Sequence, residues 1–91
     1  MKIPKKFKLG RKTFNVRRAP LSRGVLGQVW PLDGLVAMAQ HKRSPKDEAE
    51  TFWHEVTHAI LFSMNDPRWR NEKFVTAFSK RLNQVVHTAE F

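Results

Sequence analysis

The chain has 91 residues and a formal net charge of +9 at pH 7, with 17 lysines and arginines against 8 acidic residues. A chain of this length has room for one modest core, so residues 1–91 are expected to form a single domain. It contains no cysteine, which excludes disulfides and thiolate metal sites, and no apolar run close to the roughly 20 residues that a membrane span needs.

Apolar residues alternate with charged residues near the start of the chain. Phe7 and Leu9 are followed by Phe14 and Val16, with a Gly-Arg-Lys segment between the two pairs. This period of two predicts two short strands joined by a tight turn, with one apolar face and one basic face. No apolar stretch follows the basic start of the chain, so we expect no signal peptide and, in the absence of disulfides, a cytoplasmic protein.

Segments 27–30 and 35–39 predict a third and a fourth strand. The sequence Pro-Leu-Asp-Gly at 31–34 predicts the turn between them, because proline fixes φ and glycine tolerates positive φ. Residues 35–39 are all apolar, which predicts a strand buried on both faces, although their alanines and methionine equally suit a helix. The first half of the chain therefore predicts a small, mostly antiparallel sheet of three to four strands.

A helix is predicted over about 45–64. Ser44 is a good N-cap and Pro45 suits the first helical position. The helix is expected to end at Asn-Asp-Pro (65–67), because the residue before a proline resists the α conformation.

This helix contains the pattern His-Glu-x-x-His, formed by His54, Glu55 and His58. Residues four apart project from the same side of a helix, so both imidazoles can bind one metal ion. Glu55 projects about 100° away from His54, where its carboxylate can accept a proton from water close to that metal. The alternative is that His54 and Glu55 are surface residues and His58 is packed in the core.

A second helix is predicted over about 70–88, and its start offers a third metal ligand. A zinc hydrolase needs three protein ligands and an open fourth position. Glu72 is the best candidate, because a turn after the first helix would fold this residue back against the histidine pair. Asp66, His41 and His87 are weaker alternatives. A structural explanation of Glu72 is that negative charge is favourable in the first turn of a helix, whether or not a metal binds.

Several further residues are expected to support or border this site. Thr57 and Asn71 are candidates for orienting a ligand. The chain has no tyrosine, so a group that stabilises an oxyanion would have to be His41, His87 or an arginine. Most aromatic residues are expected in the core, namely Phe52, Trp53, Phe62, Phe74 and Phe78. The core is also the expected place for Trp30 and Trp69, although Trp69 precedes the proposed third ligand and could line a cleft.

These features resemble the small zincin-like metallopeptidase domains that are common in bacteriophage and prophage genomes. The resemblance covers most of the chain: the opening Lys-Ile-Pro-Lys-Lys-Phe-Lys-Leu-Gly (2–10), the hairpin before the capped helix, and Asn-Glu-Lys-Phe-Val (71–75). It implies an α+β fold, with the sheet packed on two helices. It also implies the ligand set of the gluzincins, the group that contains thermolysin, in which His54, His58 and Glu72 would bind Zn²⁺ and Glu55 would be the general base.

The resemblance further implies how a substrate would bind. A sheet edge strand beside the active helix, which we expect at 35–39, would dock an extended peptide by strand addition. Zinc would lower the pKa of its water toward about 7, and Glu55 would take the proton and pass it to the leaving amine. The predicted function is therefore a zinc-dependent metallopeptidase that acts on a protein or peptide.

The distribution of charge supports a different reading. Residues 1–46 contain twelve lysines and arginines and one acid, a net charge of +11, whereas residues 47–91 contain five and seven, a net charge of −2. Such asymmetry is typical of a surface that binds nucleic acid, and it equally fits a solvated basic face. A nucleic-acid-associated protein and a metal-stabilised module without catalysis are therefore the alternative functions.

Overall fold

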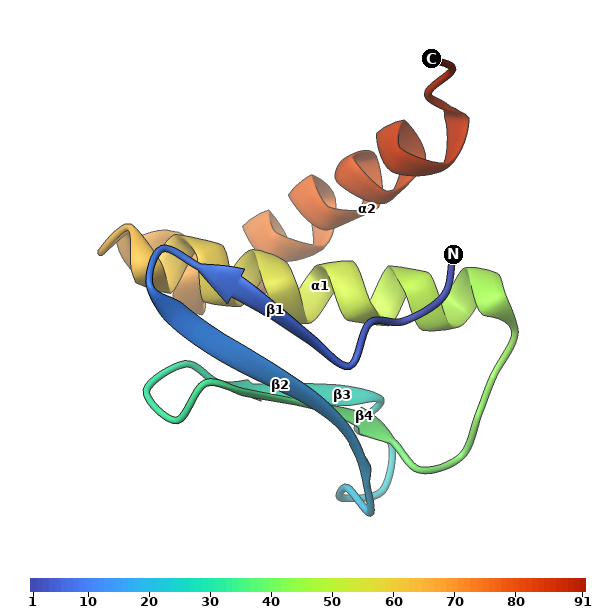
Figure 1. Ribbon diagram of the computed structural model, residues 1–91, viewed down its shortest axis with the longest axis horizontal. Helices are drawn as coiled ribbons and strands as arrows, with labels where there is room; N and C mark the ends of the chain where they lie inside the picture. The colour runs from blue at the N-terminus through green and yellow to red at the C-terminus, as the bar shows by residue number, and fades with distance from the viewer.

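The computed structural model describes residues 1–91 and contains four strands, two α-helices and one short 3₁₀ helix (Figure 1). The α+β fold predicted from the sequence is confirmed. In chain order the elements are β1 (Lys6–Leu9), β2 (Lys12–Ala19), β3 (Gly27–Trp30), β4 (Leu35–Ala39), α1 (Pro45–Ser63), η1 (Pro67–Arg70) and α2 (Glu72–Thr88).

The strands form one mixed sheet in the order β1-β2-β4-β3. The pairs β1–β2 and β3–β4 are antiparallel hairpins, and β2 and β4 are joined in parallel. The sequence predicts residues 35–39 at an edge of the sheet, and this prediction is wrong: β4 is an interior strand, the two edges are β1 and β3, and β3 is the edge strand that contacts α1. The reason is burial, since Val36, Ala37 and Met38 at the centre of β4 are all at most 2% exposed.

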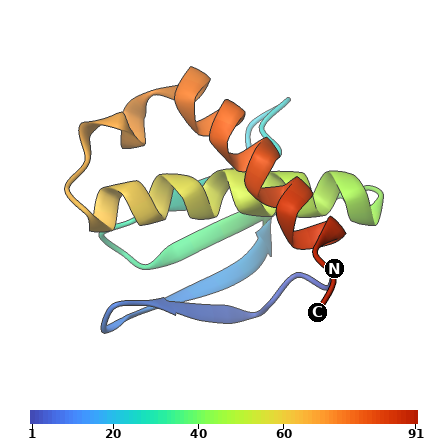
Figure 2. The same cartoon turned by 90° about the horizontal axis from the view of Figure 1, so that it is seen from above.

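The molecule has three layers, which the two views show from the side and from above (Figures 1 and 2). Helix α1 packs against one face of the sheet, contacting β3 and β4, and α2 crosses over the other side of α1. No helix covers the opposite face of the sheet. Neither helix is both long enough and apolar enough to cross a membrane.

The core lies between the sheet and α1. Phe14 of β2 and Val36 of β4 pack on Ala59 of α1. Met38 of β4 packs on Val56 and Phe52, about one turn and two turns earlier along the same helix. Alternation in β1 and β2 turns Phe7, Phe14 and Val16 toward this core and their basic neighbours outward. The prediction of a hairpin with one apolar and one basic face is therefore confirmed.

Side-chain caps define where the helices begin. Ser44 accepts a hydrogen bond from the Asp47 backbone N–H, as predicted for the start of α1. After α1 the chain turns at Asn65, whose φ of 55° is in the left-handed region that asparagine tolerates. Asp66 then caps η1, and Asn71 caps α2 by accepting from the Phe74 N–H. These two caps separate η1 from α2, which is why α2 begins at residue 72 and not near 70.

Helix α2 is only partly buried by its contact with α1. Val75 and Ser79 are buried, but the side of the predicted apolar stripe that includes Phe78, Val85 and Val86 is exposed, with Phe78 48% exposed. The expectation that Phe78 belongs to the core is therefore wrong. The 3.6-residue spacing of the apolar stripe predicted the helix correctly, but this spacing does not reveal how much of the stripe a neighbouring element covers.

Candidate metal centre

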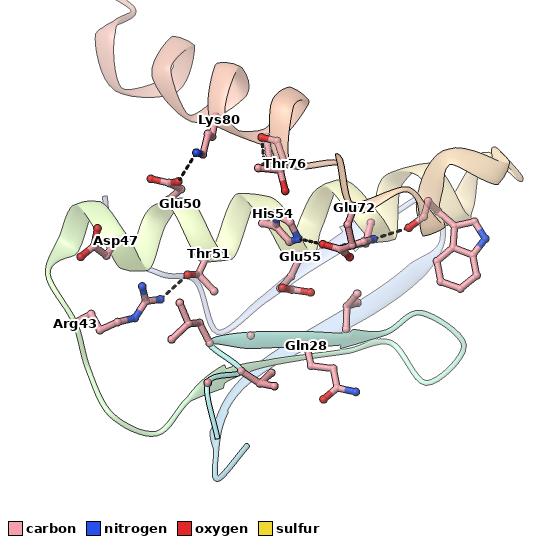
Figure 3. A pocket seen from close by; sticks show the side chains of 18 of the residues that line it. Gln28, Arg43, Asp47, Glu50, Thr51, His54, Glu55, Glu72, Thr76 and Lys80 are labelled. Carbon is pink, nitrogen blue, oxygen red and sulfur yellow. Dashed lines mark hydrogen bonds and ion pairs between the residues drawn. The ribbon is translucent and has the colours of Figure 1, made fainter. Parts of the chain in front are cut away.

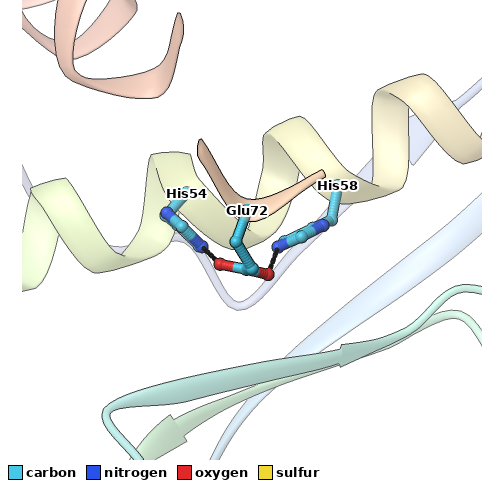
Figure 4. Close-up of side chains that lie close together, drawn as sticks. All are labelled: His54, His58 and Glu72. Atoms are coloured by element: carbon cyan, nitrogen blue, oxygen red, sulfur yellow. Dashed lines mark hydrogen bonds and ion pairs between the residues drawn. The ribbon is translucent and has the colours of Figure 1, made fainter. Parts of the chain in front are cut away.

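Three side chains converge at the predicted site (Figure 4). His54 and His58 project from the same side of α1, and the carboxylate of Glu72 lies between their rings. His54 Nε2 lies 3.0 Å from Glu72 Oε2, and His58 Nε2 lies 2.7 Å from Glu72 Oε1. All three residues that the sequence analysis selected as metal ligands are therefore neighbours in the fold.

The connection between the helices brings Glu72 to this position. The turn at Asn65 reverses the chain direction after α1, and η1 then runs back beside α1. The Asn71 cap starts α2 immediately afterwards, so Glu72 occupies the first turn of α2. A carboxylate is favourable there because the unpaired N–H groups give a helix N-terminus partial positive charge.

A backbone carbonyl orients His58. The Trp69 carbonyl oxygen lies 2.5 Å from His58 Nδ1. A carbonyl can only accept a hydrogen bond, so Nδ1 carries a hydrogen and Nε2 is the ring nitrogen that faces Glu72 and is free to bind a metal ion. This is the arrangement by which proteins commonly fix the tautomer of a ligating histidine. This contact is not visible in the sequence, because the partner is a backbone group, which carries no residue-type signal.

The donor atoms suit a tetrahedral divalent cation. Two imidazole nitrogens and a carboxylate oxygen are ligands that zinc accepts, and these atoms all lie within 4.8 Å of one another. Bond lengths of about 2.0–2.1 Å place neighbouring ligand atoms of tetrahedral zinc roughly 3.3 Å apart. The two nitrogen–oxygen distances fall slightly below this value, so an ion could be accommodated by a small movement of the exposed Glu72 side chain.

Glu55 lies beside the centre and is not part of the ligand group. Its side chain points from α1 toward β3 (Figure 3), and the residue is only 8% exposed. Burial raises the pKa of the Glu55 carboxyl to about 7; His58 opposes this change and Glu72 adds to it. Glu55 can therefore both accept and release a proton near neutral pH.

Gly27 of β3 makes the close packing around Glu55 feasible. A Cβ at this position would lie 2.7 Å from Thr51 Cγ2 and 3.1 Å from Glu55 Cγ. Only a residue without a side chain lets β3 approach α1 this closely at the level of Glu55. The sequence places Gly27 in a predicted strand but does not reveal this role, because the approach of β3 to α1 depends on strand order.

A cleft of about 720 Å³ contains the centre (Figure 3). The segment 24–29 forms one side of the cleft, α1 forms its floor, and η1 and α2 form the other side. Trp69, which was expected in the core, lines this cleft and also packs its ring on Phe62, so it is partly buried and partly wall. Among the groups proposed to stabilise an oxyanion, His41 and His87 do not line the cleft, whereas Arg43 and Arg70 do.

Several residues that the sequence offered as a metal ligand or as a group that orients a ligand have other roles in the structure. Asp66 caps η1 and pairs with Arg68, whose hydrogen bonds lower the pKa of Asp66 to about 2. Thr57 donates to the Trp53 carbonyl, and Asn71 caps α2. The expectation that Thr57 and Asn71 orient the metal ligands is therefore wrong: their side chains form hydrogen bonds to the backbone of their own helices.

Comparisons of this chain with protein-family models, with curated proteins and with solved structures found no match. The arrangement of the site is accordingly the basis for the functional conclusion.

Proposed function

We propose that this protein is a zinc-dependent metallopeptidase. The observation that supports this proposal is the convergence of His54, His58 and Glu72 on one point beside a buried carboxylate, in a cleft bordered by an edge strand. A structural role alone would require neither the oriented Nε2 atoms nor a buried acid next to them, because burial of an unpaired carboxyl has a free-energy cost.

In this proposal His54, His58 and Glu72 hold the cation, and the Trp69 carbonyl keeps His58 in the correct tautomer. When bound, zinc would supply a Lewis acid that activates water and polarises the scissile carbonyl. Glu55 acts as the general base: its carboxylate takes the proton from the attacking water and then delivers it to the leaving amine. A pKa near 7 suits both transfers at neutral pH.

Arg70 is the cation best placed to stabilise negative charge that develops on the substrate. Of the two arginines that line the cleft, Arg43 donates to Thr51 and lies 3.8 Å from Glu48, so an acidic partner already offsets its charge. Arg70 forms no ion pair with an acid and lies two residues before Glu72. Its guanidinium rests 5.1 Å from the centre of the Trp69 ring.

The substrate class follows from strand β3. Its inner edge pairs with β4, and its other edge borders the cleft. An extended peptide can pair with these free backbone groups and pass the zinc ligands on α1. This proposal replaces residues 35–39 with residues 27–30 as the docking strand.

The test is Glu55→Gln, which keeps the size of the side chain but removes its basicity. Zinc analysis of the purified variant should still find about one ion per chain, while cleavage of unfolded casein by the zinc-loaded protein should fall by about 10²–10⁴-fold. Glu50→Gln is the matched control, since Glu50 is another carboxylate of α1 that lines the cleft, and it should retain activity.

Two results would contradict the proposal. Wild-type protein that binds zinc but cleaves no peptide would favour a metal-stabilised module. Activity that survives in Glu55→Gln would exclude Glu55 as the base.

A further inference from the structure

No helix covers one face of the sheet (Figure 1), and the charged strand residues on that face are all basic. Because Phe7, Phe14, Val29 and Val36 face the core, the alternate residues on each strand face the other way. We call this surface the outer sheet face; the strand residues that form it are Lys6, Lys8, Thr13, Asn15, Arg17, Ala19, Gln28, Trp30, Leu35, Ala37 and Ala39.

The basic residues of this face have no acidic partner. Lys6, Lys8 and Arg17 are exposed and form no ion pair, and none of the four strands contains an aspartate or glutamate. Arg18 shows the contrast, because it points to the inner side and pairs with the buried Glu48. The three outward charges therefore repel one another without a compensating contact inside the protein.

An aromatic side chain lies on the same surface. The strand register places Lys6, Asn15, Leu35 and Trp30 in one row across the four strands. At a strand spacing of about 4.8 Å, the row spans about 14 Å from β1 to β3. In the next row Arg17 and Gln28 flank Ala37, which is only 2% exposed although no helix lies over it. Gln28 borders the cleft, but Figure 3 shows its side chain extending to the side of β3 opposite α1.

We infer that the outer sheet face binds single-stranded nucleic acid. Unpaired cations attract the phosphate backbone, and a partly exposed indole gives a base a surface on which to stack. Asn15 and Gln28 add amide groups that can form hydrogen bonds with base edges. This inference is independent of the proposed peptidase activity, because the face lies on the other side of the sheet from the metal centre.

Two other acidic partners fit the face less well. A membrane surface would require apolar side chains that protrude, but Trp30 and Leu35 are only partly exposed. An acidic peptide would gain strand pairing only at the edges of the sheet, and would leave the indole on the outer face unused.

The test measures fluorescence anisotropy of a labelled 20-nucleotide single strand of mixed sequence with the full chain, between about 50 and 200 mM salt. The triple variant K6Q/K8Q/R17Q should bind about tenfold or more weakly than wild type. The slope of log K against log salt concentration should decrease in magnitude by about 2, because each lost phosphate contact contributes roughly 0.7. The matched control K46Q/K73Q/R81Q also lowers the net charge from +9 to +6, but on the helices, and should bind almost as well as wild type.

Substitutions of Trp30 test whether a base stacks on its indole ring. Trp30→Leu should weaken binding roughly 5- to 150-fold, whereas Trp30→Phe, which keeps an aromatic ring, should restore most of it. Far-ultraviolet circular dichroism checks that each variant is folded. An equal loss of binding in both triple variants, stronger binding to the duplex of the same sequence, or binding to phosphatidylserine vesicles without binding to the oligonucleotide would each overturn the inference.

Discussion

At the scale of single residues, Gly27 and Glu55 depend on each other. Glu55 is held out of water by the close approach of β3, and this burial raises the pKa of its carboxyl to about 7. A raised pKa means that the stability present at acidic pH decreases as the pH rises from about 4.5 to about 7, because the folded state holds a proton that the unfolded chain has released. In the metal-free state, this raised pKa lowers the free energy of unfolding by about 3 kcal/mol above pH 7.

The first prediction at this scale is that Gly27→Ala impairs catalysis more than zinc binding. The new Cβ would lie within 2.7 Å of Thr51 Cγ2, and Thr51 is held in place by a hydrogen bond from Arg43. We expect a loss of about 1–3 kcal/mol of folding free energy from overpacking. Peptide cleavage should fall, because Glu55 is displaced, while zinc stoichiometry should stay the same. Gln28→Ala is the control, because the side chain of this neighbouring residue extends to the side of β3 opposite Glu55; equal effects of the two substitutions would contradict this explanation.

A second prediction at this scale concerns Glu48, a buried carboxylate that joins the sheet to α1. Arg18 of β2 forms an ion pair with it, and hydrogen bonding to Arg18 is the main cause of its lowered pKa. A lowered pKa contributes stability above about pH 4.5, and this contribution is lost as the pH falls through the folded-state pKa. Glu48→Gln should therefore lower the free energy of unfolding by roughly 1–3 kcal/mol at pH 7.

Urea unfolding at several pH values measures this effect. The difference between wild type and Glu48→Gln should shrink steadily toward pH 2. Glu50→Gln removes a more exposed carboxylate 3.9 Å from Lys80 and should cost less than about 1 kcal/mol. A Glu48 effect that is independent of pH would show that shape, and not charge, is what this side chain contributes.

At the scale of elements, the segment from η1 to the first turn of α2 supplies much of the site. Within a few residues it contributes the Trp69 carbonyl that orients His58, the cation of Arg70, and the carboxylate of Glu72. Two side-chain caps fix its geometry, those of Asp66 and Asn71. A change in where α2 begins would move Glu72 around the helix axis by about 100° per residue, away from the histidine pair.

We therefore predict that Asn71→Ala weakens zinc binding, although Asn71 is not a ligand. Loss of the cap should destabilise the fold by about 1 kcal/mol and should raise the dissociation constant for zinc, because the first turn of α2 frays. Ser44→Ala removes the matching cap of α1, far from the metal centre along the helix, and should cost similar stability without changing zinc affinity. Isothermal titration with zinc compares the two variants, and an unchanged affinity in Asn71→Ala would show that η1 alone positions Glu72.

At the scale of the whole molecule, the two faces of one sheet are available for two different tasks. The inner face and α1 form the core, and the edge strand β3 borders the cleft with the metal centre. The outer sheet face has no covering helix and displays unpaired positive charge. If both proposals are correct, the protein can hold a nucleic acid on one side while it cleaves a peptide on the other.

The sequence by itself determined the local structure and the identity of the candidate ligands. Alternating apolar residues specified the strands, Ser44 and Pro45 specified the start of α1, and the spacing of His54 and His58 specified a shared side of that helix. These features depend on backbone periods and caps, which act over a few residues and are therefore visible in a single sequence.

Only the tertiary structure decided which distant groups meet. It placed β3 and not β4 at the edge, set Gly27 against Glu55, brought the Trp69 carbonyl to His58, and left Phe78 exposed. Each of these outcomes depends on strand order or on the packing angle between helices, which no local pattern specifies, and two of them involve a backbone group or a missing side chain. Glu72 lies between these two categories: its residue type marked it as a candidate ligand, and the reversal after α1 brought it to the histidine pair.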